Sequence, residues 1–162
     1  GTINPCVLRP QSRGELRLRS VSPDDHPIID PRYLSHPDDM RLSLRALKFA
    51  RKIFAQPSFS RYVERSEAYP GDAMQDDAAL EHYIRSKGKT VYHPVGTCRM
   101  GTDDMAVVDP QLRVWGLRHL RVVDNSIMPT LISGNTNAPA IMIGEKASDV
   151  IRGAAALRPS DA

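Results

Sequence analysis

Residues 92–101 read YHPVGTCRMG, a stretch whose pattern is that of a loop and not of a helix or a strand. Its proline and two glycines indicate that the loop has a defined shape, and it contains a single histidine, His93. A loop histidine can transfer protons near neutral pH, and it can equally be a hydrogen-bonded structural group. The residues alone leave both interpretations of His93 open.

The chain before this loop is expected to form a strand and two helices. Alternating leucines and arginines in residues 13–20, RGELRLRS, predict a half-buried strand. Residues 37–57 predict the longest helix, which starts with a proline and two aspartates and stops at a second proline. Residues 76–88 predict another helix that ends at a glycine. Their apolar faces are expected to hold Met40, Leu44, Leu47 and Phe54 in the first helix, and Leu80, Tyr83 and Ile84 in the second.

The chain after the loop predicts three short strands, at residues 106–110, 112–116 and 120–124, and then a final helix over 138–157. Small residues recur every four positions in that helix, which predicts a face that lies close against another backbone. We therefore expect an α+β fold, with an antiparallel sheet and flanking helices. The small residues are Ala140, Gly144 and Ser148.

Composition limits the class of protein. A chain of 162 residues that is 41% hydrophobic and 25% charged is typical of a globular domain. The net charge of +3 is scattered, so we expect no nucleic-acid partner. No apolar run approaches the roughly 20 residues of a membrane span, and we expect a cytoplasmic or peripheral membrane-associated location. Two cysteines, Cys6 and Cys98, make no disulfide framework, and their redox state stays open.

Metal and nucleotide motifs are missing from this sequence. His93 and Cys98 lie five residues apart without a second pair of ligands, so we expect no metal site. Cys98 has no base nearby in the sequence and is expected to be a small buried thiol. Neither GxGxxG nor GxxxxGK[ST] occurs, so this chain does not by itself supply the usual cradle for a dinucleotide.

A second polar cluster, SGNTNAP at residues 133–139, directly precedes the final helix. The N–H groups and the dipole at a helix N-terminus favour an anion or a polarised carbonyl there. Asn137 can instead be only the N-cap of the helix. Both roles are compatible. The polar residues of the cluster are Asn135, Thr136 and Asn137.

Two stretches carry a resemblance to a known family. VYHPVGTCRMG at 91–101 and VVDPQLRVWGLRHLRVVDNSIMPTLISGNTNAPAIMIGEKASDVI at 107–151 resemble the C-terminal part of the glucose–methanol–choline (GMC) family of flavin-dependent oxidoreductases. The chain is most similar to the choline dehydrogenase-like members. Residues 12–34, together with the helix that follows, resemble the last stretch of the family's substrate-binding domain.

The resemblance implies roles for individual residues. His93 would face the flavin and take the proton of an alcohol, or stabilise the alkoxide, while a hydride passes to the flavin N5. Asn135 would occupy the second catalytic position and hydrogen-bond the substrate oxygen. Asp124 and Asn125 would lie near the ribityl and phosphate region of FAD. Asn135, together with Thr136 and Asn137, would also lie near the flavin pyrimidine ring.

The resemblance also implies a domain organisation. Residues 2–115 would belong to the substrate-binding domain, residues 116–153 would return to the FAD-binding domain, and residues 154–162 are a tail. Because the GxGxxG turn is missing, we expect a C-terminal portion whose partner is an N-terminal FAD-binding portion. Such a fragment is not expected to retain FAD or to be active alone, and its final helix could mediate homo-oligomerisation.

The implied activity is oxidation of a small-molecule primary alcohol, choline or another, with FAD as the cofactor. Two alternatives from other classes stay open at this point. One is a non-catalytic ligand-binding module derived from the family, and the other is a structural piece that assembles with a separate flavin-binding chain.

Overall fold

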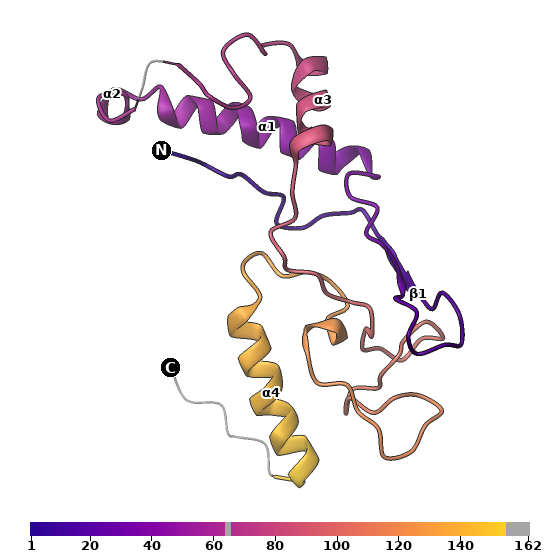
Figure 1. Cartoon of the computed structure of the whole chain (residues 1–162). Coiled ribbons are helices and arrows are strands. Elements are labelled where there is room, and N and C mark those ends of the chain that lie inside the picture. Colours follow the sequence, from indigo (N-terminus) through magenta and orange to yellow (C-terminus); the bar gives the residue numbers. More distant parts are fainter. Residues whose placement is uncertain (64–65, 155–162) are drawn as a thin grey trace. The chain divides into compact units, whose positions relative to one another are not determined.

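The computed structural model describes residues 1–63 and 66–154, which divide into two compact units, Gly1–Val91 and a second unit that begins at Tyr92 (Figure 1). The predicted division at residue 115 concerns the domains of a longer protein, and it stays a prediction. The first unit contains β1 (Glu15–Arg17), β2 (Ile28–Asp30), α1 (Pro37–Phe54), α2 (Pro57–Ser60) and α3 (Asp77–Lys87); the second contains the 3₁₀ helix η1 (Asn125–Ile127) and α4 (Asn137–Arg152).

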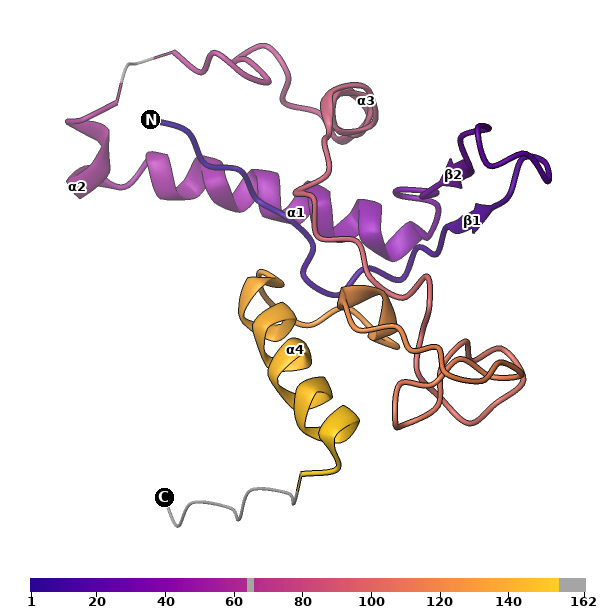
Figure 2. The same cartoon turned by 60° about the horizontal axis from the view of Figure 1, so that its bottom comes forward.

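Strands β1 and β2 form an antiparallel pair, visible as the hairpin in Figure 2, with Leu16 opposite Ile29. Gly14 is needed just before β1, because a side chain there would come within 2.2 Å of the Asp30 carbonyl oxygen. The predicted strand is present, but its predicted half-burial is wrong. Leu16 is 49% exposed and Ile29 is 68% exposed, since within the described residues β1 and β2 contact only each other among the helices and strands.

Helices α1 and α3 pack across each other and bury the core of the first unit (Figure 1). Both predicted helices are confirmed, because their apolar periods and their terminal prolines and aspartates are strong local signals. Met40 and Leu44 from α1 meet Leu80 and Ile84 from α3, and all four are buried. Phe54, the last residue of α1, instead packs edge to face on Phe59, with ring centroids 5.7 Å apart.

The predicted strands of the second unit do not form. Isolated bridges take their place, and they join Val108 to Val114 and Arg113 to Arg121. Leu112, Gly116 and His119 all have positive φ, at 66°, 76° and 61°, and these turns interrupt any extended run. The antiparallel sheet of the described structure is therefore the two-stranded β1–β2 pair, within an α+β arrangement.

Helix α4 closes the core of the second unit. Ile143 and Ala147 on α4 pack with Val108, Leu112, Ile127 and Met128. The helix ends at Arg152, before the predicted end at residue 157, because Gly153 takes a left-handed conformation with φ of 67°. Residues 155–157 of the prediction lie outside the described residues.

Within the described residues, the predicted close-packing face of α4 has no close neighbour at its centre. A side chain added at Gly144 would meet nothing within 4 Å, and Ile141, Met142 and Ile151 are more than half exposed. Among the helices that the structure describes, none is long and apolar enough to cross a membrane.

A buried carboxylate fixes the N-terminal segment of the first unit to α1. Asp39 is 2% exposed and accepts hydrogen bonds from the backbone N–H groups of Gln11 and Ser12, both at 2.8 Å, and from the Ser12 hydroxyl. Burial by itself would raise the pKa of Asp39, but the hydrogen bonds from Ser12 and Gln11 outweigh it and lower the pKa below its ordinary value of 3.8.

We predict that Asp39→Asn lowers the free energy of unfolding at pH 7 by about 1–3 kcal/mol, because buried N–H donors lose their charged acceptor. The folded pKa is depressed, so the carboxylate stabilises the fold above the ordinary value of 3.8 and ceases to do so as pH falls through the folded pKa. Urea unfolding followed by circular dichroism should therefore show a difference from wild type that shrinks below pH 3.8. Asp38→Asn, whose carboxylate is 48% exposed, is the matched control and should change little. An equal loss in both variants would contradict this role of Asp39.

Candidate active site

A hydrogen bond across 43 residues of chain forms the centre of the candidate site. The Nδ1 atom of His93 lies 2.8 Å from the Oγ1 atom of Thr136. His93 is half-buried, whereas Thr136 is only 4% exposed. The structure therefore brings together the loop histidine and the polar cluster before the final helix, the two places that the sequence singled out.

The backbone around His93 is held by the segment that contains η1. The N–H of Cys98 donates to the Ser126 carbonyl at 3.0 Å, and the N–H of Met100 donates to the Ile127 carbonyl at 2.8 Å. Gly96 has a φ of +89°, and a side chain there would press to 3.3 Å from the Met128 carbonyl oxygen. This close approach explains why the histidine loop needs a glycine.

Tyr92, next to His93, has a φ of +62°, in the left-handed region that non-glycine residues seldom adopt. Such conformations cost free energy and cluster at functional sites, where the surrounding structure imposes them. On the C-terminal side of His93, the backbone hydrogen bonds of Cys98 and Met100 restrain the chain and limit how far this conformation can relax.

Thr136 is placed by α4. It is the N-cap residue, its carbonyl accepts the N–H of Ala140 at 3.0 Å, and the helix behind it is fixed in the core through Ile143 and Ala147. Its side chain makes no capping hydrogen bond. The interpretation of Asn137 as the N-cap is wrong, because Asn137 is the first residue of the helix proper.

Asn135 and Asn137 flank Thr136 and are both exposed. In the described part of the chain, neither side chain has a hydrogen-bond partner, so both amides are available to a ligand. Together with the uncapped N–H groups at the start of α4, they form a polar surface that can receive a carbonyl or a negative charge.

The other predicted cofactor residues lie in the segment bound to the histidine loop. Asp124 caps η1 by accepting the N–H of Ser126 at 2.7 Å. The Oδ1 atom of Asn125 is buried and lacks a hydrogen-bond partner among the described residues. A buried polar atom normally has a partner, so this oxygen is one hydrogen bond short. The roles of both residues in cofactor binding stay predictions.

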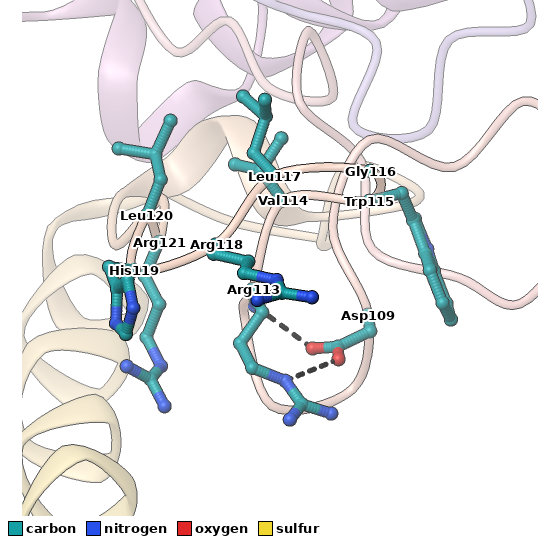
Figure 3. A pocket seen from close by; sticks show the side chains of 10 residues that line it. All are labelled: Asp109, Arg113, Val114, Trp115, Gly116, Leu117, Arg118, His119, Leu120 and Arg121. Carbon is teal, nitrogen blue, oxygen red and sulfur yellow. Dashed lines mark hydrogen bonds and ion pairs between the residues drawn. The ribbon is translucent and has the colours of Figure 1, made fainter.

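Other chemical features of the chain lie apart from these residues. In the described part, no group of three or more His, Cys, Asp or Glu side chains could hold a metal ion. Cys98 is half-buried and Cys6 is exposed, and both are free thiols. Figure 3 shows a hollow lined by Asp109 and residues 113–121, where Arg113 hydrogen-bonds Asp109 at 2.7 Å. None of the predicted site residues lines this hollow.

Comparisons with known proteins all find relatives among oxidoreductases. The family described as GMC oxidoreductase matches residues 10–144. An alcohol dehydrogenase [acceptor] of Pseudomonas putida is 51% identical over 150 residues, which is 93% of this chain and 27% of that protein. The mitochondrial choline dehydrogenase of Homo sapiens is 47% identical over 156 residues, which is 95% of this chain and 26% of that protein.

The likeness extends to solved structures. An FAD-dependent oxidoreductase from Chaetomium thermophilum has a TM-score of 0.83 and 34% identity, over 90% of this chain and 25% of that one. The chain thus spans about a quarter of the length of these relatives. Because the family match covers most of the 162 residues, the chain belongs to the GMC oxidoreductase family.

Proposed function

We propose that this chain is the C-terminal portion of a flavin-dependent enzyme that oxidises a primary alcohol, choline or a similar compound. The observation that carries the proposal is the His93–Thr136 hydrogen bond, which holds an imidazole at the N-terminus of α4. Two exposed amides beside it have no side-chain partner in the part of the chain that the structure describes. Relatives named alcohol dehydrogenase and choline dehydrogenase support an alcohol as the substrate.

The residues present fit one end of FAD. Asn135, Thr136 and Asn137 would hold the flavin pyrimidine ring at the uncapped start of α4, where N–H groups and the helix dipole favour negative charge. Asp124 and Asn125 would lie along the ribityl chain, and the partnerless oxygen of Asn125 fits a hydroxyl donor there. When bound, FAD would supply the acceptor for the hydride of the alcohol carbon, which carries both electrons of the oxidation.

The ADP half of the cofactor would be held outside this chain, since no GxGxxG turn occurs in the sequence. We propose that residues 2–115 belong to the substrate-binding domain and that residues 116–153 return to the FAD-binding domain. An N-terminal FAD-binding portion is then the partner of this chain, and it would cover the exposed apolar side chains of α4. Residues 155–162 of the tail lie outside the described residues.

Two side chains would act on the alcohol oxygen. The Nε2 atom of His93 would take the hydroxyl proton, because histidine is the side chain most often used as a general base. The Asn135 amide would donate a hydrogen bond to the same oxygen without a change of charge. Negative charge that develops on the oxygen would thereby be balanced by an imidazolium and an amide dipole.

We predict that His93→Ala in the complete protein slows reduction of the flavin by alcohol by roughly 10² or more, the scale of losing a positioned acid–base group. Anaerobic stopped-flow absorbance measures this step, and visible absorbance of the purified variant should show FAD content near that of wild type. His82→Ala, which alters an exposed histidine on α3, is the matched control and should reduce at the parental rate. If His93→Ala also reduces at that rate, His93 has no part in the chemistry.

At Asn135 we predict that His is tolerated better than Ala. A hydrogen-bonding side chain would still reach the substrate oxygen in Asn135→His, whereas Asn135→Ala leaves that oxygen short of one partner, at a cost of about 1–3 kcal/mol. Steady-state kcat/KM on a panel of primary alcohols that includes choline compares the two variants. An alanine variant as active as wild type beside an inactive histidine variant would remove this role from Asn135.

A further inference from the structure

We propose that Thr136 is a positioning residue for His93, in addition to any contact with the cofactor. Its hydroxyl holds the Nδ1 side of the imidazole and so directs Nε2 toward the substrate oxygen. This inference rests on the proposed function, because it concerns how His93 performs the proton transfer assigned to it. Three features of the structure support it.

The first feature is the use of the Thr136 hydroxyl. A threonine at the N-cap ordinarily accepts an N–H of its own helix, and this bond contributes typically about 1 kcal/mol. Thr136 makes no such bond, although the N-cap side chains of α1, α3 and η1 all do. Within the described residues, its one side-chain hydrogen bond is that at 2.8 Å to His93. Pro139, at the third helical position, has no N–H, so only the N–H of Ala138 could be capped, and the hydroxyl bonds the imidazole instead.

The second feature is rigidity on both sides of the bond. Thr136 is 4% exposed, so water competes little for its hydroxyl. Its helix is anchored by Ile143 and Ala147, and the histidine loop is anchored by two backbone hydrogen bonds to residues 126 and 127. Because both α4 and the histidine loop are anchored, the hydrogen bond between them holds the imidazole ring in one orientation. A hydrogen bond between two mobile surface side chains does not do this.

The third feature is the chemistry of a hydroxyl partner. A neutral imidazole that is to accept a proton at Nε2 carries its hydrogen on Nδ1, and Thr136 Oγ1 can accept that hydrogen. After Nε2 takes the alcohol proton, the same Nδ1–H still donates to Oγ1, now from a charged ring. The hydroxyl thus suits both states of His93, so no rearrangement is needed during the transfer.

The test is a double-mutant cycle in the complete protein, read as the rate of flavin reduction by alcohol. Thr136→Val keeps the shape but removes the hydroxyl, and we expect a rate roughly tenfold lower, as for the loss of one hydrogen bond of ordinary strength. Thr136→Ser restores a hydroxyl and should regain most of the rate. In the His93→Ala background, Thr136→Val should change the rate by less than about twofold, because the residue it acts through is gone.

The outcomes separate this inference from the proposed function. Full activity in Thr136→Val beside a slow His93→Ala overturns the positioning role and leaves the proposed function intact. An equal loss from Thr136→Val in both backgrounds shows a merely structural or cofactor-binding role, and it also overturns the inference. His93→Ala at the parental rate overturns the proposed function itself. If Thr136→Val does not fold, Thr136→Ala removes the hydroxyl with less demand on space and is judged by the same comparison.

Discussion

The second unit depends on one constraint, which is that the loop after Tyr92 must stay attached to the segment before α4. Two backbone hydrogen bonds, from Cys98 and Met100, join the loop to η1, and the His93–Thr136 bond joins its beginning to the helix. Few regular elements support this region, since isolated bridges replace the expected strands. The geometry of the candidate site is therefore held by specific hydrogen bonds around a small apolar core and not by a regular sheet.

That arrangement places the imidazole of His93 at the positive end of a helix. Negative charge on a bound ring or oxygen is favoured there, and the exposed amides of Asn135 and Asn137 make no side-chain hydrogen bond to the described residues. The same helix leaves apolar side chains such as Ile141 and Met142 exposed in this chain. The proposed N-terminal portion would cover them, and this chain spans about a quarter of the length of its relatives.

Local signals in the sequence predicted the parts of the fold that rest on local energetics. The apolar period of α1 and its terminal prolines located that helix within a few residues, and Gly88 marks the end of α3 as predicted. The end of α4 at Gly153 was missed, because the predicted helix ran on to residue 157. The strands after residue 105 were predicted wrongly because Leu112 and His119 adopt positive φ, which their residue types do not reveal. The burial of Leu16 was also wrong, since burial depends on what packs against a strand and not on its own pattern.

For the site, the sequence singled out both halves but not the contact between them. The resemblance to the GMC family implied catalytic roles for His93 and Asn135. In the structure, His93 hydrogen-bonds Thr136, the residue next to Asn135. The partnership with Thr136 could not be predicted, because a threonine before a helix is normally its cap and no local pattern shows its hydroxyl diverted to a residue 43 positions away.

The central claim is that His93 and Asn135 act together on one oxygen of an alcohol beside a bound flavin. A crystal structure of the complete protein, with FAD and an unreactive analogue of the alcohol bound, tests it most directly. We predict that His93 Nε2 and the Asn135 amide both lie at hydrogen-bonding distance, about 2.7–3.2 Å, from the oxygen of the analogue, with Nδ1 still bonded to Thr136. An imidazole turned away from the flavin, or an Asn135 amide out of reach of that oxygen, would contradict the account.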